Sequence, residues 1–478
     1  KIEVDRVAKG LMAAGVQSGD HVALWLMNCS EWIFAMYALA KIGAVQVPVN
    51  TRFRNHGLAY LLKNSDAKFL ITHDVSGPID YFEMTSEVLN MPTTGNDITD
   101  PEYPEMKGVF ILGESEPVGT TNWRSLVAGG DVLSDAELQS REESVNPDDP
   151  VFIMYTSGTT GFPKGVMHNH IMVRLIEERA FRMSINEHDT ILNYLPLFHL
   201  FSYSEGALMS MITGARQVIT ETFVADECMQ LIEKEKCSII HGFETHLKDM
   251  MEAQERHRVD ISTLRTGLFA CGMKSSIHTC TRAAEVLAPL VTVTGYGMSE
   301  MGAATLVGSL HDTVEQRAAS SGYIAPGYSC RIVNPETGTD QAVDEPGEII
   351  FKGYGMMMGY YNKPKETADS YDQDGWFHTG DTGLRRSDGY IQFLGRYKDM
   401  LKVGGENVDP MEVEGLLLQF EGVQQVAVVG YPDARLSEVP VAYVQKRERA
   451  TIEEEDVIGY CKGKVASFKM PRHVLFLD

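Results

Sequence analysis

A segment rich in hydroxyl groups and glycines, YTSGTTGFPKG at 155–165, carries the strongest chemical signal in the sequence. Thr and Ser hydroxyls, exposed backbone N–H groups and Lys164 would together suit a polyphosphate, because amides and an ammonium group both bind anionic oxygens. The segment is not a P-loop, since that motif requires G-x-x-x-x-G-K-[ST] and here Gly165 follows Lys164. The residues alone fit either a phosphate site or a surface turn of small residues.

A second segment, GYGMSEMG at 295–302, places an acid directly after a predicted strand. Glu300 is a candidate Mg²⁺ ligand, because that cation prefers carboxylate oxygens, and Ser299 is a candidate donor to a phosphate oxygen. The segment superficially matches a dinucleotide fingerprint, but the third glycine of that pattern is missing. GYGMMMG at 353–359 is a similar partial match, and its methionines favour core or loop filling over a cofactor site.

Two further segments have functional and structural interpretations that the residues alone leave open. GWFHTGD at 375–381 ends in Asp381, whose carboxylate could accept both hydroxyls of a ribose or could cap the turn. GRYKDMLKVGGENVDPMEVE at 395–414 brings Arg396, Lys398 and Lys402 close to a glycine pair, and it could instead be a charged, solvated linker.

These segments lie between elements that alternate in type. Apolar runs typical of buried strands alternate with amphipathic stretches typical of helices, which indicates parallel sheets covered by helices. The predicted strands before residue 320 are 21–27, 44–50, 68–74, 151–157, 217–220, 237–242, 267–272 and 291–297. The predicted helices are 4–16, 30–42, one from about 170, 225–236, 245–257 and 277–288. The segment 75–150 mixes Pro, Gly, Thr and acids and is predicted to be mostly loop.

The pattern changes twice toward the C-terminus. From about 320, short strands separated by turns predict an antiparallel region. Beyond Arg396 we expect a small α/β domain, with helices over 410–420 and from about 452 and strands over 423–430 and 440–445. Thr451 and Glu454 are expected to form a capping box at the start of the last helix.

Composition limits the classes of protein to which the chain can belong. Its 478 residues, 44% hydrophobic and 23% charged, are typical of a globular enzyme with a sizeable core. The net charge of −24 argues against coating nucleic acid or an anionic membrane, because both need a basic surface. The 7 cysteines are scattered without a C-x-x-C pair, which favours reduced thiols over a disulfide framework or a zinc site. No signal peptide or apolar run of spanning length is visible, so a cytoplasmic location is expected.

Taken together and in order, the motifs carry a strong resemblance to a known superfamily. They read YTSGTTGFPKG, YLPLFHLFS, FACGMKSS, GYGMSE, GEIIFKG, GWFHTGD and GRYKDMLKVGGENVDPMEVE. The chain resembles AMP-forming acyl-adenylate enzymes, which include acyl-CoA synthetases, peptide-synthetase adenylation domains and beetle luciferases. The resemblance implies an α/β fold. A large N-terminal domain, 1–395, would have helix-covered, mostly parallel sheets and a small β-barrel-like region, followed by a small mobile α+β domain, 396–478, incomplete at its C-terminus.

The resemblance also implies an activity, that of an ATP-dependent acid–CoA ligase. A carboxylate would attack the α-phosphorus of Mg-ATP and expel pyrophosphate, and CoA would then take the acyl group and release AMP. The expected partners are a small-molecule carboxylic acid, ATP, Mg²⁺ and CoA, with a homodimer left open. An adenylation enzyme that loads a carrier-protein thiol is the related alternative, and a non-catalytic nucleotide-binding relative is a more distant one. A serine hydrolase is disfavoured because the sequence has no G-x-S-x-G elbow.

Family roles carry over to the matching positions of this sequence. Asp381 matches the ribose-binding aspartate, Glu300 the Mg²⁺ ligand and Lys398 the hinge between the domains. The implied catalytic residues are Lys164, Glu300, His199 and Arg396. The implied ATP- and AMP-binding residues are Thr156, Ser157, Gly158, Thr159, Thr160, Gly161, Lys164, Gly272, Gly295, Tyr296, Gly297, Met298, Ser299, Asp381 and Arg396.

The same resemblance implies an acyl pocket and a CoA side. The implied acyl pocket contains Phe198, His199, Phe243, His246 and Met301, with His199 as its gate. Aromatic and medium-sized residues there suggest an aromatic, alicyclic or short-to-medium acid. Rotation of the small domain about Lys398 is expected to bring Gly404, Gly405 and Glu406 beside CoA.

Two further features of the sequence bear on the site. His168 and His170 have metal-like spacing, but no third ligand stands nearby and both are interpreted as structural. The superfamily places an adenylation lysine shortly after a K-x-P-R stretch. This chain reads FKMPRHVLFLD over 468–478, so that lysine is expected beyond residue 478.

Overall fold

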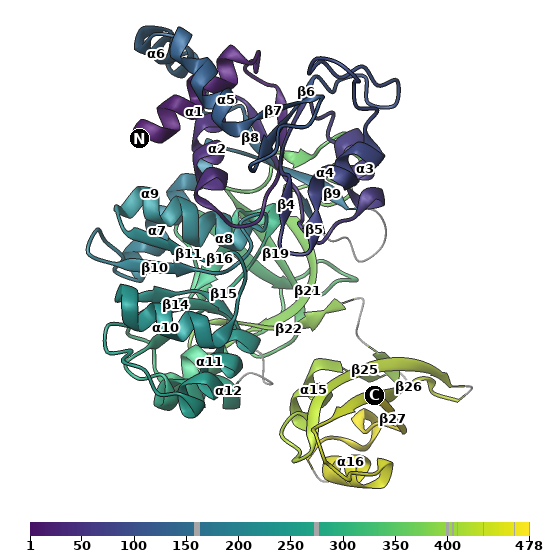
Figure 1. The fold of residues 1–478 in the computed structure, drawn as a ribbon. Helices are drawn as coiled ribbons and strands as arrows, with labels where there is room; N and C mark the ends of the chain where they lie inside the picture. The colour runs from purple at the N-terminus through teal and green to yellow at the C-terminus, as the bar shows by residue number, and fades with distance from the viewer. Residues whose placement is uncertain are drawn as a thin grey trace.

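The computed structural model has two parts that follow one another along the chain (Figure 1). It describes residues 1–156, 163–271, 277–397, 401–403, 406–408, 410–433, 435–462 and 464–477. The large part runs from α1 (Ile2–Ala13) to β22 (Ile391–Arg396), and the small part runs from β23 (Leu401–Val403) to β27 (His473–Leu477). The mixed α/β architecture expected from the sequence is confirmed.

The first sheet consists mainly of parallel strands in the order β20-β9-β8-β2-β1-β3-β6-β7. Its strands are β1 (His21–Trp25), β2 (Val45–Pro48), β3 (Phe69–His73), β6 (Gly108–Leu112), β7 (Thr120–Asn122), β8 (Pro150–Thr156), β9 (Lys164–Asn169) and β20 (Gly359–Tyr360). Strands β9 and β20 are antiparallel at one edge. Helices α1 and α2 (Ser30–Lys41) pack on the face that carries Leu24, and α3 (Asn55–Asn64) packs on the face that carries Trp25.

The prediction that 75–150 is mostly loop is wrong. The segment contains β4 (Val75–Ser76), β5 (Ile79–Asp80), α4 (Tyr81–Val88), β6, β7, α5 (Trp123–Gly129) and α6 (Asp135–Glu143). Strand β6 is short but buried, and it extends the parallel sheet beside β3. Helix α6 is strongly acidic, yet a capping box stabilises it, because the Ser134 and Glu137 side chains each accept from the other's backbone N–H. The polar composition of 75–150 therefore predicts loop where the chain forms helices and strands.

The second sheet has the order β11-β10-β12-β14-β15-β16-β17, parallel as far as β15. Its strands are β10 (Thr190–Asn193), β11 (Arg216–Ile219), β12 (Ile239–Ile240), β14 (Thr266–Ala270), β15 (Val291–Met298), β16 (Ala303–Val307) and β17 (Tyr323–Ile324), with β13 (Gly242–Phe243) paired to β14. Its helices include α7 (Val173–Arg182), α10 (Ala225–Glu235), α11 (Glu244–Arg256), α12 (Ile277–Val286) and α13 (Val314–Ala319). The parallel strands end at one edge, where α/β proteins commonly bind ligands.

The helical segment after β10 changes its hydrogen-bonding pattern along its length. It consists of α8 (Leu200–Ser202), a π-helical turn η3 (Tyr203–Leu208) and α9 (Met209–Thr213). Every residue of η3 is buried. Such π-helical turns occur frequently at functional sites.

The region expected to be antiparallel is a four-stranded sheet, β18-β19-β21-β22. It contains β18 (Tyr328–Val333), β19 (Gly347–Gly353), β21 (Phe377–Arg385) and β22, and α14 (Pro364–Ala368) lies between β20 and β21 in the chain. Strand β22 pairs with β21 in a register that sets Arg396 opposite Asp381.

The small part has its own apolar core and a mixed sheet, with β27 parallel to β26. Its other elements are β24 (Glu406–Val408), α15 (Pro410–Leu417), β25 (Val423–Asp433), β26 (Ser437–Lys446) and α16 (Glu454–Cys461). The predicted capping box of Thr451 and Glu454 is wrong. Helix α16 begins two residues later than that box requires, so Glu453 is the N-cap and Asp456 completes the box.

Within the described ranges, no helix has both the length and the apolar composition that crossing a membrane requires.

Candidate active site

Strands β8 and β9 bracket the hydroxyl-rich segment. Their antiparallel register pairs Thr156 with Lys164, so the two ends of the segment lie side by side. The ammonium group of Lys164 lies 4.5 Å from the ring centroid of Tyr360. The other residues predicted to bind phosphate here lie outside the described residues, namely Ser157, Gly158, Thr159, Thr160 and Gly161.

The carboxylate predicted to bind Mg²⁺ follows β15 in a 3₁₀ turn, Ser299–Met301. Glu300 Oε1 accepts a hydrogen bond of 2.8 Å from the Tyr360 hydroxyl, and the Glu300 carbonyl accepts one of 2.8 Å from the backbone N–H of Met357. Main chain and side chain are therefore held by the same segment, 357–360. Sequence reasoning treated the neighbouring methionines as filling and did not select Tyr360.

His168 supports the same turn from β9. Its Nε2 lies 2.6 Å from the carbonyl oxygen of Ser299. Burial lowers the pKa of His168 to about 4, so the ring is neutral near pH 7 and Nε2 carries the proton that it donates. The interpretation of His168 as structural agrees with this contact.

The residues at Glu300 fit a magnesium ion held jointly with a nucleotide. Among the described residues, no cluster of three or more His, Cys, Asp or Glu side chains could form an all-protein metal cage. Mg²⁺ usually needs no such cage, because it binds through one or two carboxylates together with substrate phosphates. Glu300 offers one carboxylate, its Oε1 accepting from Tyr360, and the Lys164 ammonium group lies over the ring of the same tyrosine.

The predicted ribose ligand lies on β21 and is nearly buried, with Asp381 6% exposed. Its Oδ2 accepts a hydrogen bond of 2.6 Å from the Tyr296 hydroxyl, and its Oδ1 lies 3.8 Å from Arg396 Nε. Burial raises the pKa of the Asp381 carboxyl, while the Tyr296 hydrogen bond and the Arg396 charge oppose that rise. The Tyr296 ring stacks on Phe393 with 5.4 Å between centroids, which fixes an aromatic surface beside the carboxylate.

A cavity of about 320 Å³ lies at the ends of β14 and β15. Its lining residues are Leu195, Pro196, His199, Leu200, Phe201, Ser202, Phe243, Leu268, Ala270, Gly295, Gly297, Met298, Ser299, Ala303 and Ala304. Small residues make room along β15. A Cβ on Gly297 would lie 1.9 Å from the carbonyl oxygen of Ala303, so only glycine fits there.

His199 and Phe243, two residues of the predicted acyl pocket, line this cavity. His199 is exposed at its edge, and desolvation together with the nearby Arg52 charge lowers the pKa of its imidazole. The ring is therefore neutral near pH 7.

The structure places the other predicted pocket residues elsewhere. Met301 is fully buried in a core cluster with Leu306 and Phe351, because the 3₁₀ turn points it away from the cavity. His246 caps helix α11 by accepting from the backbone N–H of Phe243 over 3.0 Å. Phe198 is buried and packs against the ring of His199, with 4.5 Å between centroids.

Some predicted site residues cannot be placed. Gly272, Lys398, Gly404 and Gly405 lie outside the described residues, and Glu406 is described only as part of β24. The predictions for them are therefore unchanged.

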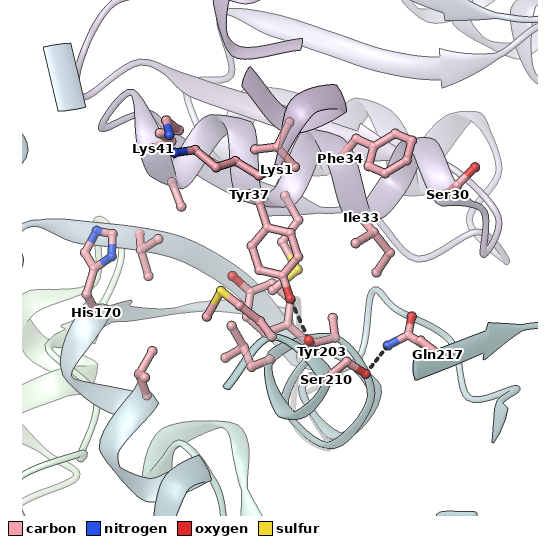
Figure 2. A pocket seen from close by; sticks show the side chains of 18 of the residues that line it. Lys1, Ser30, Ile33, Phe34, Tyr37, Lys41, His170, Tyr203, Ser210 and Gln217 are labelled. Carbon is pink, nitrogen blue, oxygen red and sulfur yellow. Dashed lines mark hydrogen bonds between the residues drawn. The ribbon is translucent and has the colours of Figure 1, made fainter. Parts of the chain in front are cut away.

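A second and larger cavity, of about 790 Å³, lies between α2 and the η3–α9 segment (Figure 2). Ile33, Phe34 and Tyr37 line it from α2, and the Tyr37 hydroxyl donates to the carbonyl of Ala207 across it. None of the residues predicted from sequence to act in catalysis or binding lines this cavity.

Comparison with known proteins places the chain in a family. The family model described as AMP-binding enzyme matches residues 1–361, and the model of the AMP-binding enzyme C-terminal domain matches 412–478. A putative acyl-CoA synthetase of Bacillus subtilis, YngI, is 34% identical over 99% of this chain and 86% of its own length. The 3-[(3aS,4S,7aS)-7a-methyl-1,5-dioxo-octahydro-1H-inden-4-yl]propanoyl:CoA ligase of Rhodococcus jostii is 32% identical over 99% of this chain and 89% of its own length.

A solved structure agrees with these sequence matches. The crystal structure of ATP-bound MatB from Rhodopseudomonas palustris superimposes with a TM-score of 0.83 at 25% identity, covering 100% of this chain and 88% of that one. These matches, together with the nucleotide motifs, show that the chain belongs to the AMP-binding enzyme family and is an AMP-forming acyl-CoA synthetase.

Proposed function

We propose that residues of the large part of this acid–CoA ligase form the acyl-adenylate and that the small part contributes to the transfer of the acyl group to CoA. The observation that carries the proposal is the meeting of Glu300 and Lys164 at Tyr360, beside a cavity whose wall includes Ser299. A carboxylate held in that cavity would lie next to the cation and the ammonium group that its reaction with ATP requires.

Adenylate formation is opposed by the repulsion between an anionic carboxylate and the anionic phosphates of ATP. An anionic carboxylate oxygen attacks the α-phosphorus, the new P–O bond forms, and the bond to pyrophosphate breaks. Lys164 would lower the repulsion by binding phosphate oxygens, and Ser299 would donate to the α-phosphate. A bound Mg²⁺ would supply Lewis-acid stabilisation of phosphate charge, with Glu300 as its protein ligand. Because the net charge of the chain is −24, these local positive groups must act against an unfavourable overall field.

The adenosine would bind between β15 and β21. Asp381 offers carboxylate oxygens to the ribose hydroxyls, Tyr296 offers a ring to the adenine, and Arg396 is close enough to Asp381 to contact ribose or phosphate. The Tyr296–Asp381 hydrogen bond prearranges two of these groups.

The second half-reaction would use the small domain. We assign 1–395 to the large domain and 396–478 to the small one, with Lys398 as the hinge between them. The four-stranded sheet ends at Arg396, and the separate apolar core of the small part supports a boundary there. Gly404, Gly405 and Glu406 would lie on the CoA side after rotation.

The substrate is proposed to be an aromatic, alicyclic or short-to-medium carboxylic acid. A cavity of about 320 Å³ lined mostly by apolar side chains supports this size and polarity. The ligase of Rhodococcus jostii is named for a bicyclic propanoyl substrate, which falls within this class.

The test of the proposed substrate class is a panel of carboxylic acids, assayed by AMP release in the presence of ATP, Mg²⁺ and CoA. We expect turnover with compact aromatic or alicyclic acids and with medium-chain acids, and little turnover with long-chain acids. A preference for long chains would contradict the size assignment. Thioester formation with free CoA, rather than with a carrier protein alone, would agree with the relatives, whose names specify CoA. A cytoplasmic location and a homodimer stay predictions.

Replacing Asp381 by alanine is expected to weaken ATP binding by about 1–3 kcal/mol, because hydrogen bonds to a nearly buried diol are lost. This corresponds to roughly a fivefold to hundredfold rise in Kd, measured by calorimetry with a non-hydrolysable ATP analogue. Asp340→Ala is the matched control, since Asp340 lies on the surface beside the same sheet and pairs with Arg331. Unchanged ATP affinity in Asp381→Ala would contradict the ribose assignment.

A further inference from the structure

The side chain of Tyr360 contacts both charged groups of the proposed adenylation site. Its hydroxyl donates to Glu300 Oε1 over 2.8 Å, and its ring lies 4.5 Å from the Lys164 ammonium group. We propose that Tyr360 is a positioning residue for adenylation, whose hydroxyl orients the Glu300 carboxylate and whose ring holds Lys164. This inference rests on the proposed roles of Glu300 and Lys164.

The backbone around Tyr360 fixes its position. Strand β20 pairs with β9, which sets Tyr360 opposite Val166, two residues from Lys164. The segment is further anchored by backbone hydrogen bonds, from Met358 to Met167 over 2.9 Å and from Tyr361 to Gly165 over 2.8 Å. The Tyr360 N–H itself donates to Thr367 Oγ1 over 2.9 Å. The phenol therefore projects from a well-supported strand rather than from a loop.

The chemistry of the two contacts suits positioning. A hydrogen bond to an ionised carboxylate is stronger than one between neutral groups. The Tyr360 hydroxyl bonds to Oε1, and because the carboxylate is rigid, this bond also sets the direction of Oε2. Tyr360 is 6% exposed, so its nearly buried hydroxyl needs a hydrogen-bond partner, and Glu300 Oε1 supplies it.

The ring has a second effect. Glu300 and Lys164 carry opposite charges and both touch one phenol, the first at the hydroxyl and the second at the ring. With the phenol in place each group is held by the aromatic residue, through a hydrogen bond or a cation–π contact. Removing the ring would let the two charges pair directly, which would withdraw both from a nucleotide and its cation.

Two substitutions separate these effects. Tyr360→Phe removes the hydroxyl and keeps the ring, whereas Tyr360→Leu removes both. Tyr361→Phe is the matched control, because the Tyr361 hydroxyl also donates to a carboxylate, Asp66 Oδ2 over 2.7 Å, outside the proposed site. Circular dichroism melting identifies any variant whose fold is compromised, and binding is measured at a temperature where every variant is folded.

The binding experiment uses Mn²⁺, titrated by electron paramagnetic resonance with α,β-methylene-ATP present. For Tyr360→Phe we expect about tenfold weaker Mn²⁺ binding, as is typical when a residue that orients a metal ligand is lost. The metal-free affinity for the analogue should stay within about twofold in Tyr360→Phe. In Tyr360→Leu the metal-free affinity for the analogue should fall by about threefold to thirtyfold, because the cation–π contact with Lys164 is lost. Tyr361→Phe should match the unmodified protein in both measurements.

The kinetic experiment compares the half-reactions. ATP–pyrophosphate exchange by Tyr360→Phe should need about tenfold more Mg²⁺ for half-maximal rate, while thioester formation from supplied acyl-adenylate and CoA stays within about twofold. Unchanged Mn²⁺ binding in Tyr360→Phe, or equal losses in both half-reactions, would overturn the proposal. Absence of exchange in the unmodified protein would instead contradict the proposed function, and the Mn²⁺ titration would still test Tyr360.

Discussion

Replacing Glu300 by glutamine is expected to slow adenylate formation by about 10²- to 10³-fold while the fold is retained. The glutamine keeps the shape of the side chain, and its carbonyl oxygen can still accept the hydrogen bond from Tyr360. What disappears is the negative charge that a magnesium ion requires of its protein ligand. The loss should therefore fall on the step in which phosphate charge develops.

The measurement is ATP–pyrophosphate exchange with the acid that gives the fastest turnover. Thioester formation from supplied acyl-adenylate is the internal comparison, and it should change little because no triphosphate takes part in it. Glu315→Gln is the matched control, since Glu315 is an exposed acid that pairs with Arg386 on the surface. An exchange rate for Glu300→Gln within tenfold of the unmodified rate would contradict the assignment of Glu300.

Replacing Arg179 by methionine is expected to lower the free energy of unfolding of the large domain by about 3–5 kcal/mol. Arg179 and Glu205 are both 0% exposed, and Arg179 Nε lies 2.5 Å from Glu205 Oε1. Arg179 Nη1 also donates to the carbonyl of Ala304, which lines the cavity of about 320 Å³. Burial raises the pKa of Glu205 and the Arg179 charge opposes this rise, so methionine would leave a buried carboxyl group without its counterion.

Urea unfolding, followed by the fluorescence of the buried tryptophans, would measure this change. The double substitution Arg179→Met with Glu205→Leu should recover most of the loss, because replacing a whole buried pair by apolar side chains is often neutral or stabilising. Arg256→Met is the control, since Arg256 and Asp226 form an exposed pair whose loss should cost at most about 1 kcal/mol. A double variant as unstable as the single variant would show that the cost does not come from the unpaired charge.

Much of the fold followed from the sequence because its parallel strands are apolar runs separated by helical patterns. The predicted strands 21–27, 44–50, 68–74 and 291–297 correspond to β1, β2, β3 and β15, with ends that differ by a few residues. The loop prediction for 75–150 is wrong because the strands of this segment are short and its last helix is acidic. There the stabilising interactions are caps and edge pairing, which leave little hydrophobic periodicity.

The residues proposed for the nucleotide site could be selected from the sequence for a different reason. Groups that contact a phosphate or a ribose must be of a particular chemical type, so Lys164, Glu300 and Asp381 stand out within short motifs. The predicted acyl pocket agrees only in part with the lining of the cavity of about 320 Å³. Met301 and His246 have the right size and polarity, but only the local turn and the cap decide where their side chains point. Tyr360 and Arg179 act through partners far away in the sequence, and no local pattern reveals such contacts.

Strand β15 has a practical consequence for retooling this ligase toward other acids. Gly295, Gly297 and Met298 line the cavity proposed to hold the acyl group, while the Tyr296 hydroxyl on the same strand donates to Asp381. Changes along β15 would therefore trade substrate preference against nucleotide affinity. Other lining residues, Leu200 and Phe201 on α8 and Leu268 on β14, include none of the groups assigned to ATP. Libraries confined to these three positions should yield altered acid preference while the residues proposed to bind ATP stay unchanged.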